Sequence, residues 1–558
     1  MVATTTGDTL PDGALPDGAH PEPGVHDRRW WTLVVLCLSL VTVILGNTVL
    51  NVALPTLVRD LDATSTQLQW MVDSYALVFA GLLLTGGALG DRFGHKGALQ
   101  IGLVIFGLAS LLSVFATTAD HLVATRAIMG IGAALVMPAT LSILTAVFPP
   151  AERAKAIAIW AGLAGSGAAI GPIAAGFLLE HFWWGSVFLL NVPVVVGALV
   201  AGRFFVPRSK DPDQAPLDPR GAGLSIVGLG ALLYAIIEAP VHGVTHPRTL
   251  AAAGIAVVVL ATFAWWELRA SSPMLDLKLF RDRRFSAASA AITLTFFAMF
   301  GMFFLLTQHL QLVLGYSALQ AGIRTLPMPL MMMVVAPNSA RIVERFGPRR
   351  VIVTGLLLVT AALASLSLLD GSTPYVQLAI SLAFLAVGMG LTMPPATTLI
   401  MSSLPLGKAG VGSAVNDTTR ELGGALGVAI LGSLLTSAYR DGLGEALAGS
   451  PAPAVEAARS SLGGALAVAE QLGDGAIADA ARAAFVDGLG IAVLVGAAMT
   501  LLGAAFVAWH LRPSRTGEQI DGHRVDAAPS PPEATTLEQR QGPVLEPSYA
   551  GENRLDPA

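Results

Sequence analysis

Residues 87–96 read Gly-Ala-Leu-Gly-Asp-Arg-Phe-Gly-His-Lys and lie between two apolar blocks, and residues 344–349 repeat the pattern as Glu-Arg-Phe-Gly-Pro-Arg between two further blocks. A second sequence motif is also repeated. Gly130-Ile-Gly132 and Gly388-Met-Gly390 are both followed by Met-Pro and then by Ala-Thr. The first two texts are 253 residues apart and the second two about 257. Repeats at so long an interval predict a chain of two structurally similar halves.

The composition is that of a membrane protein. Of the 558 residues, 54% are hydrophobic and only 13% are charged, whereas soluble domains carry about 25% charged residues. The apolar residues are gathered into blocks of about twenty, the length of a helix that crosses a hydrocarbon core of about 30 Å. We therefore predict an all-α polytopic membrane protein in contact with the lipid bilayer.

Composition also argues against other classes of protein. The net charge of -5 is small and dispersed, so we expect no nucleic-acid partner. A single cysteine, Cys37, rules out an internal disulfide and a cysteine metal cluster. The sequence contains no phosphate-binding GxxxxGK[ST] loop, no HExxH zinc motif and no other catalytic signature. We predict neither an enzyme, nor a bound metal, nor a cofactor.

Fourteen apolar blocks are long enough to span a bilayer. Six of them form a predicted N-terminal half over 30–204, two lie in a linker over 205–285 that falls outside the repeat, and six form a C-terminal half over 286–511. The tails 1–29 and 512–558 lack apolar cores and are predicted to be disordered. The predicted spans are residues 31–53, 70–90, 97–118, 121–147, 154–177, 185–204, 221–240, 249–268, 286–312, 319–341, 350–369, 376–399, 410–437 and 484–511.

The distribution of Lys and Arg predicts the orientation of these spans. With both tails in the cytoplasm, the inner loops and helix flanks hold 22 of the 33 basic residues, and the short outer loops hold only Arg59 and Arg248. Cytoplasmic loops carry the excess of Lys and Arg, so we expect both termini inside a bacterial cell. The Ala/Gly-rich stretch 438–483 then becomes an external loop with one or two short amphipathic helices, either a lid or, as we favour, a tolerated insertion.

Four short motifs occur in order on successive spans. Span one ends in Asn51-Val-Ala-Leu-Pro55, the 87–96 stretch joins spans two and three, span four carries Arg126-Ala-Ile-Met-Gly130-Ile-Gly132, and span five carries Gly167-Ala-Ala-Ile-Gly171-Pro172 within 162–176. Together they resemble the fourteen-span drug:proton antiporters of the major facilitator superfamily. The resemblance implies a monomer with two six-helix halves plus two inserted helices. It also implies proton-coupled export of lipophilic drugs, antibiotics or related natural products by alternating access.

The chain departs from the family pattern at two positions. The family usually has an acidic residue on span one where this chain has Gly46, which leaves Asn47 and Asn51 as the polar groups there. The outer end of span six usually carries an arginine between aromatics, and here reads Trp184-Gly185-Ser186. The first departure makes a carboxylate role on span one doubtful.

Two of the motifs have a predicted role in the conformational cycle. The carboxylate of Asp91 can accept hydrogen bonds from the free N–H groups at a neighbouring helix start, which would form a latch that breaks when the halves rock; a solvated loop is the alternative. The fifth-span glycines and proline indicate either a hinge or seal, or plain helix packing. The predicted latch comprises Gly87, Gly90, Asp91, Arg92, Gly94 and Lys96 with the repeated Glu344 and Arg345, and the predicted hinge comprises Gly167, Gly171, Pro172 and Gly176.

Ionisable residues inside spans are the strongest functional candidates, because a charge near the bilayer centre costs about 3 kcal/mol or more. Counted from the start of span thirteen, Asp417 and Glu421 lie roughly 12 and 18 Å deep and on one helix face. Two carboxylates so close resist double ionisation, so one of them is expected to keep its proton. We predict a proton-coupling site of Asp417 and Glu421, although a structural Asp417–Arg420 pair is the alternative. Arg420, which could favour the ionised form of Asp417, is also a coupling candidate, and Asp73 and Arg126 complete the set of five.

Substrate contacts are predicted only weakly. Polar, aromatic and methionine side chains could line an adaptable apolar cavity, and the weak candidates are Asn47, Asn51, Trp70, Tyr75 and Met328. The same fold could also serve a metabolite uniporter or importer, although the fifth-span motif argues against it. A membrane receptor without transport is a further alternative, but it would require a folded signalling domain that neither tail indicates.

Overall fold

The computed structural model describes residues 25–208, 218–271, 273, 275–370, 373–403, 409–444, 446–447 and 450–511. The predicted tail 512–558 and residues 1–24 of the other tail lie outside the described residues. Side chains are described for most of this range, with gaps in the first part of the fifth long helix and at residues 409–414.

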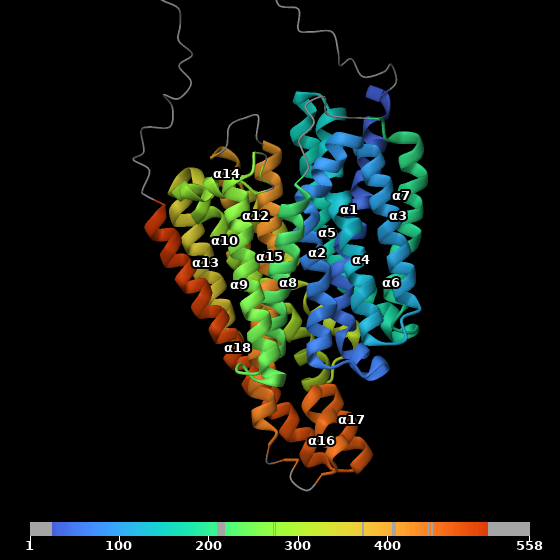
Figure 1. Ribbon diagram of the computed structural model, residues 1–558, viewed down its shortest axis with the longest axis vertical. Coiled ribbons are helices and arrows are strands. Elements are labelled where there is room, and N and C mark those ends of the chain that lie inside the picture. Colours follow the sequence, from blue (N-terminus) through green and yellow to red (C-terminus); the bar gives the residue numbers. More distant parts are fainter. Residues whose placement is uncertain are drawn as a thin grey trace, which may run out of the picture. The chain divides into compact units, whose positions relative to one another are not determined.

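The N-terminal half consists of helices joined by short turns (Figure 1). Its sixth predicted span is broken at Leu190 into a single turn and a longer helix. The helices are α1 (Val25–Leu61), α2 (Ser65–Phe93), α3 (His95–Val114), α4 (Ala119–Val147), α5 (Pro150–His181), α6 (Ser186–Leu189) and α7 (Asn191–Phe205). The inserted pair follows as α8 (Pro219–His242) and α9 (Pro247–Arg269).

The C-terminal half repeats this arrangement with two further breaks. The first helix ends in a π-helical turn, and the second is interrupted just before Pro327. The elements are the 3₁₀ turn η1 (Leu277–Arg281), α10 (Arg283–Gln308), the π-helix η2 (His309–Val313), α11 (Ala318–Arg324), α12 (Pro327–Phe346), α13 (Pro348–Leu366), α14 (Tyr375–Ser402), α15 (Ala409–Gly442), α16 (Ala452–Ser460), α17 (Leu462–Leu472) and α18 (Gly475–His510).

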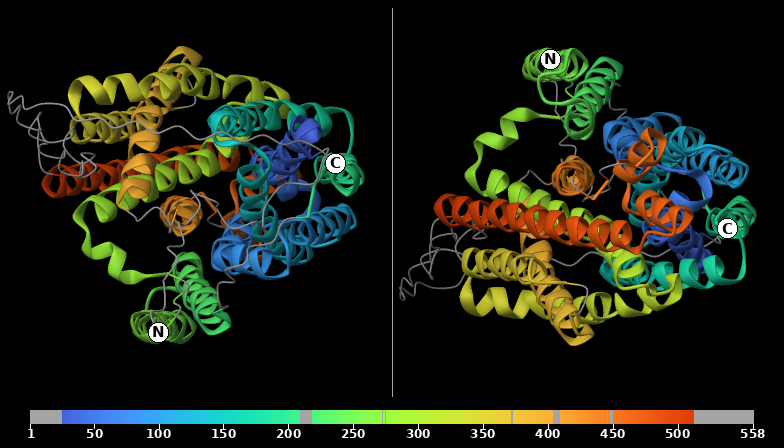
Figure 2. Two further views of the ribbon diagram at one scale, coloured as in Figure 1. Left: turned by 90° about the horizontal axis from the view of Figure 1, so that it is seen from above. Right: turned by 90° about the horizontal axis from the view of Figure 1, so that it is seen from below.

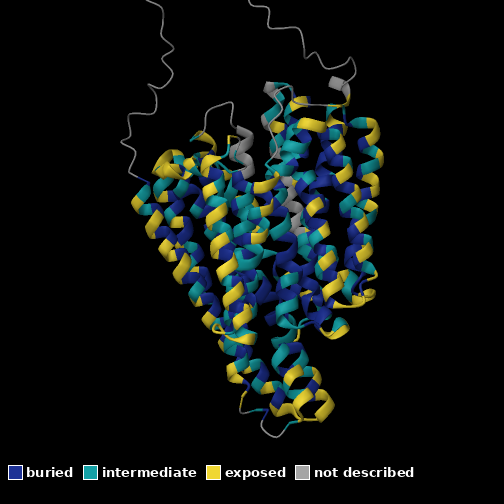
Figure 3. Cartoon of the chain, in the orientation of Figure 1, coloured by how far each residue is buried: buried dark blue, intermediate teal, exposed yellow. Residues whose placement is uncertain are grey.

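The described residues form helices and turns without a strand, as the sequence predicted. Thirteen helical segments of the described residues are long and apolar enough to cross a membrane. Helix α5, with 32 residues, lies where the remaining span was predicted. Exposed apolar side chains such as Val257, Leu502 and Trp509 lie on the outer helices, as expected of surfaces that face lipid. Buried residues line the interior between helices, and exposed ones lie along their outer flanks (Figure 3).

The sequence repeat has a structural counterpart at two helix corners. Gly94 joins α2 to α3 with φ of 103°, and Gly347 joins α12 to α13 with φ of 79°. Side chains are strained at such positive φ angles, so glycine is favoured at both corners. In each corner the arginine two residues earlier lies over the next phenylalanine, with Arg92 5.6 Å from the Phe93 ring centroid and Arg345 5.4 Å from that of Phe346.

The glycine repeat produces matching close helix crossings. A Cβ on Gly132 would lie 2.7 Å from the carbonyl oxygen of Gly102, and a Cβ on Gly388 would lie 2.6 Å from that of Gly355. The α3–α4 crossing in one half therefore corresponds to the α13–α14 crossing in the other. Small residues allow such close backbone approach in membrane helices.

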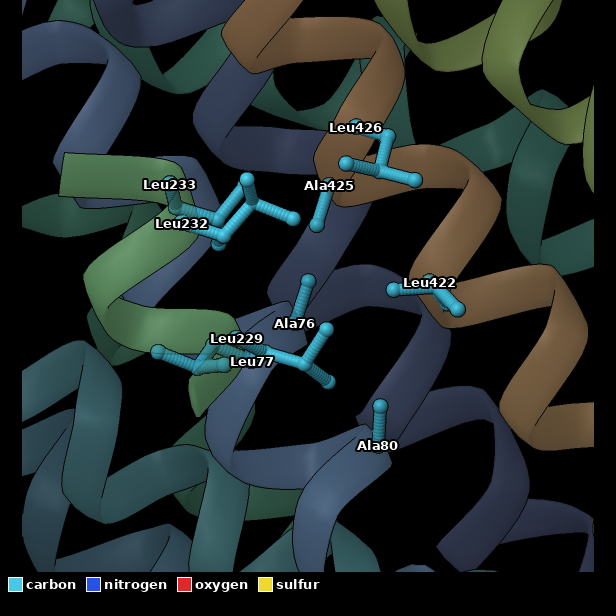
Figure 4. A pocket seen from close by; sticks show the side chains of 9 residues that line it. All are labelled: Ala76, Leu77, Ala80, Leu229, Leu232, Leu233, Leu422, Ala425 and Leu426. Atoms are coloured by element: carbon cyan, nitrogen blue, oxygen red, sulfur yellow. The ribbon is translucent and has the colours of Figure 1, made fainter. Parts of the chain in front are cut away.

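The two halves lie side by side when viewed along the helices, and α8 and α9 lie at their margin (Figure 2). Helix α8 packs on α2, where a Cβ on Gly81 would meet Ile226, and on α15, where the Ser433 hydroxyl donates to the carbonyl of Ile236 at 2.9 Å. Small and aliphatic side chains of all three helices line a narrow apolar crevice (Figure 4). Helix α8 of the inserted pair thus covers the seam between α2 and α15.

The stretch predicted as an external loop is largely helical. Helix α15 continues to Gly442 and α18 begins at Gly475, so both reach into the 438–483 segment. The short helices α16 and α17 lie between them, at the end opposite to the start of α1 and the end of α18 (Figure 1). The buried Tyr439 hydroxyl lies 2.9 Å from the carbonyl oxygen of Ala458, which fixes α16 to α15. Hydropathy underestimated the flanking helices because the last turn of α15 and the first turns of α18 contain charged residues.

Candidate functional site

Arg126 is fully buried in α4 and held by backbone carbonyls of two other helices. Its Nε donates to the Met71 carbonyl at 3.0 Å, and its Nη1 donates to the Gly46 carbonyl at 2.7 Å. The Tyr75 ring centroid lies 4.3 Å from its Cζ, a cation–π distance. Nη2 has no hydrogen-bond partner among the described residues. The guanidinium therefore keeps the two N–H groups of Nη2 available for a further group.

The glycine at position 46 has a structural reason. A Cβ there would lie 2.6 Å from Cζ of Phe106, so a side chain requires the aromatic ring to move. The Gly46 carbonyl supplies the acceptor for Arg126. The resemblance led us to expect an acidic residue on span one. Position 46 has no room for such a side chain because the Phe106 ring occupies the space.

Asp417 lies in a polar cluster on α15. Its Oδ1 is 3.5 Å from Nη1 of Arg420 and 3.4 Å from Nδ2 of Asn416. The hydroxyl of Thr397 on α14 donates to Oδ1 of Asn416 at 3.1 Å. The side chains of Asp417 and Arg420 are 23% and 30% exposed, so water can reach the pair.

Asn416 and Thr397 were not among the predicted site residues. Thr397 is the last residue of the second repeated text, which was the signal that could have identified it. Asn416 directly precedes Asp417 and faces α14 instead of the opposite half. A neutral side chain inside an apolar span draws less attention than a charged one.

Glu421 brings the two halves of the chain together. It interacts electrostatically with Asp417 and Arg420 on its own helix, and with Arg126 and Tyr75 of the N-terminal half. The carboxylate of Glu421 is repelled by the like charge of Asp417 and attracted by the opposite charge of both arginines. The structure therefore places four of the five predicted coupling residues, Asp417, Glu421, Arg420 and Arg126, in one electrostatic cluster.

Asp73, the fifth, is fully buried on α2, and neither carboxylate oxygen has a hydrogen-bond partner among the described residues. One turn earlier, Oε1 of the buried Gln69 lies 3.4 Å from the Ser433 hydroxyl of α15. Asp73 thus lies close to a contact between the halves without joining the described hydrogen bonds.

Two of the four predicted hinge residues, Pro172 and Gly176, lie at a backbone contact between the halves. A Cβ on Gly176 of α5 would lie 2.4 Å from Cα of Leu319, and a Cβ on Gly322 of α11 would lie 2.5 Å from the Pro172 carbonyl. Gly171 instead faces α1, where a Cβ would meet the hydroxyl of Thr48. Gly167 lies in α5 among residues whose side chains are not described.

Polar contacts join the halves at the same end. Leu319 N–H of α11 donates to Oε1 of Glu180 in α5 at 3.3 Å, and Gln311 Nε2 donates to the Val52 carbonyl of α1 at 2.9 Å. A Cβ on Gly463 of α17 would also meet Val58 of α1. The halves are therefore closed against each other at the end that carries α16 and α17.

The predicted latch residues lie at the other end of the helices. The Asp91 carboxylate is 3.6 Å from Nε2 of His95, the first residue of α3. The ammonium of Lys96 donates to the carbonyls of Arg203 and Val206 at the end of α7. Glu344 and Arg345 are exposed. The glycines Gly87, Gly90 and Gly94 lie along the last turns of α2 and at its corner with α3.

The weakly predicted substrate contacts lie in different surroundings. Tyr75 belongs to the Arg126 cluster. The Asn51 amide donates to the carbonyl of Asn47 within α1 at 3.3 Å. The Trp70 ring lies 6.4 Å from Tyr234 of α8, and Met328 is buried at the start of α12. The structure gathers no common cavity from these five among the described residues.

A model of the Major Facilitator Superfamily matches residues 36–428. The chain belongs to this superfamily. It is 38% identical over 484 residues to a protein named multidrug efflux pump LfrA from Mycolicibacterium smegmatis, covering 86% of this chain and 96% of the relative. It is 33% identical over 496 residues to the tetracenomycin C resistance and export protein of Streptomyces glaucescens, covering 87% and 92%.

Further comparisons agree with this membership. The methyl viologen resistance protein SmvA of Salmonella typhimurium is 36% identical over 479 residues, which are 85% of this chain and 97% of that protein. A bacterial homolog to the human lysosomal transporter Spinster, in an inward-facing and occupied conformation, has the same fold with a TM-score of 0.61 and 16% identity, over 87% of this chain and 97% of that one. The resemblance predicted from the motifs is confirmed.

Proposed function

We propose that this superfamily member exports small lipophilic molecules from a bacterial cell in exchange for protons. One observation carries the proposal: Glu421, which lies beside Asp417 in one half, interacts electrostatically with the buried Arg126 of the other half. Ionisable groups held inside a membrane protein usually act in transport. Relatives named for efflux and resistance support the direction and the class of cargo.

The cluster can couple the binding of a proton to the rocking motion of the two halves because its members lie on opposite halves. An ionised Glu421 is attracted to Arg126, which favours the approach of the halves around the site. A proton on Glu421 removes that attraction, whereas Asp417 remains beside Arg420. Proton binding and release on opposite sides of the membrane would then bias the two conformations, as a ligand with different affinities for two states must do.

The cargo would bind next to the acidic pair. Its surroundings are aromatic, since Arg420 lies 5.6 Å from the Phe296 ring and a Cβ on Gly424 would meet the Phe300 ring. Such walls suit flat lipophilic molecules, and a cationic cargo could replace the proton as the partner of a carboxylate. We propose drugs, antibiotics or related natural products as the cargo class.

The positive-inside distribution supports cytoplasmic termini for a transporter in the cytoplasmic membrane. With this orientation, the closed end that carries α16 and α17 faces outward. Reporter fusions at 205–220, 269–285 and both tails are expected to report the cytoplasm, and fusions in 438–483 the outside. A cytoplasmic signal from 438–483 would contradict the fourteen-span topology.

Reconstitution tests the function directly. Purified protein in liposomes is expected to move a fluorescent lipophilic cation uphill only under a proton gradient, and to exchange it downhill without one. Empty liposomes give the leak. Uphill transport that is unaffected by a protonophore would contradict proton coupling, and an absence of exchange across cationic, anionic and neutral compounds would contradict export of this cargo class.

A further inference from the structure

A basic groove lies where α3 begins and α7 ends, away from the transport site. Its volume is about 470 Å³. It is lined by Phe93, Gly94, Lys96, Gly97, Gln100, Arg203 and Arg208. None of these described lining residues is acidic, so the groove gathers positive charge without a lining carboxylate to balance it.

The three cations of the groove are held close to one another. The Lys96 ammonium is fixed by the carbonyls of Arg203 at 3.0 Å and Val206 at 2.6 Å. Arg203 and Arg208 are exposed, and both repel Lys96 electrostatically. An anion between them would replace this repulsion with attraction.

The start of α3 adds a second source of positive potential. The helix has 20 residues, and its N-cap residue Gly94 makes no side-chain capping hydrogen bond. Gly94, Lys96 and Gly97 of that turn line the groove. The positive end of the helix dipole favours a phosphate at this position.

Apolar side chains beside the groove indicate the source of the phosphate. Phe93 is 70% exposed and Phe204 is 69% exposed. The exposed Trp31 stacks on Phe205 with ring centroids 5.7 Å apart. Aromatic residues gather at the level of lipid headgroups. A soluble anion would make no contact with these apolar side chains, whereas the acyl chains of a lipid would pack against them.

We propose that the groove between α3 and α7 binds the phosphate headgroup of an anionic phospholipid in the cytoplasmic leaflet. The headgroup joins the first turn of α3 to the last turn of α7, both in the N-terminal half. It stabilises that half and requires neither proton nor cargo. Basic pockets on the cytoplasmic side of membrane helices bind such headgroups.

Thermal unfolding of the purified full-length protein tests the assignment. Phosphatidylglycerol added to the protein in phosphatidylcholine nanodiscs is expected to raise the unfolding midpoint. The double variant Arg203→Gln/Arg208→Gln should lose most of this rise, with lipid affinity falling about fivefold for each cation removed. The matched control Arg281→Gln/Arg284→Gln removes the same charge from exposed positions in the other half and should respond like the wild type.

Further arms separate the sources of phosphate and guard against misfolding. Inorganic phosphate at equal concentration should give little stabilisation, and Arg203→Lys/Arg208→Lys should restore much of the lipid response. The proposal is overturned if inorganic phosphate protects as well as the lipid does. It is also overturned if the two glutamine double variants lose the lipid response equally, or if neither loses it.

Discussion

Lys96 and Arg349 make the same contact in the two halves of the protein. Each is the second residue of the helix after a repeated glycine corner, and each donates to one or more carbonyls at the end of the last long helix of its half. Lys96 reaches the Val206 carbonyl after α7 at 2.6 Å, and Arg349 reaches that of Ala508 in α18 at 2.9 Å. A cation at a helix C-terminus satisfies free carbonyls and opposes the negative end of the dipole.

Removing either cation should destabilise its own half. Lys96→Met and Arg349→Met each remove a charged hydrogen bond, so we expect a loss of about 1 kcal/mol after discounting for partial exposure. The measurement is the thermal unfolding midpoint in detergent. Arg345→Met is the control, because Arg345 is exposed and lies over Phe346. Equal midpoints for all three variants would show that the repeated contact has no stabilising role.

Arg126→Lys should impair transport strongly even though the charge is kept. A lysine cannot satisfy both the Met71 and Gly46 carbonyls with the planar geometry of arginine. Each lost charged hydrogen bond costs about 1.5–3 kcal/mol, which corresponds to a transport rate lower by roughly tenfold or more. Uptake into inverted vesicles at matched protein level measures it. Arg324→Lys, which alters an arginine over Tyr316, is the control and should transport normally.

Asp417→Asn and Glu421→Gln should weaken proton-driven efflux more than folding. The amide keeps the size of the acid but cannot bind and release a proton. We expect Glu421→Gln to abolish proton release on substrate addition, since Glu421 is the acid that faces Arg126. At least one variant should retain downhill exchange. Proton release is followed with a pH dye in weakly buffered detergent.

The control for this series is Asp479→Asn, which neutralises an exposed acid paired with Arg482 in α18. If both single neutralisations and the double variant release protons like the wild type, coupling lies elsewhere. Asp73→Asn is then the next variant to examine, because its buried carboxylate has no described partner.

Gly176→Ala should open the closed end of the protein. The added Cβ would lie 2.4 Å from Cα of Leu319, and backbone cannot move aside as a flexible side chain can. Helices α5 and α11 must separate, so the halves should spend more time open at that end. Reactivity of a cysteine placed at Val58 reports this in a Cys37→Ser background. Gly223→Ala, which meets nothing within 4 Å, should not change the reactivity.

Gly46→Asp tests why span one lacks an acid. The Cβ of the new side chain would lie 2.6 Å from Cζ of Phe106, so we expect a lower thermal unfolding midpoint. Adding Phe106→Ala should restore part of the stability by making room. If Gly46→Asp alone is as stable as the wild type, crowding does not explain the glycine.

The sequence by itself determined the helices, the two halves and the chemistry of the site residues. Apolar blocks report where lipid surrounds the chain, since each block must satisfy its own backbone hydrogen bonds. Gly94 and Gly347 could be paired from the repeat, and both occupy the positive φ that favours glycine. Asp417 and Glu421 could be recognised because buried charge is costly wherever it occurs.

Only the tertiary structure decided which residues meet. Arg126 and Glu421 lie in different halves. Hydropathy carries no information about which helix faces of one half lie against the other half. The contact of Gly176 with Leu319, and the convergence of Lys96 with Arg203 and Arg208, depend likewise on how helix surfaces fit. In membrane proteins, the fit between helix surfaces comes from close packing of small residues and from a few hydrogen bonds. These contacts join residues far apart in the chain, so the packed structure alone reveals them.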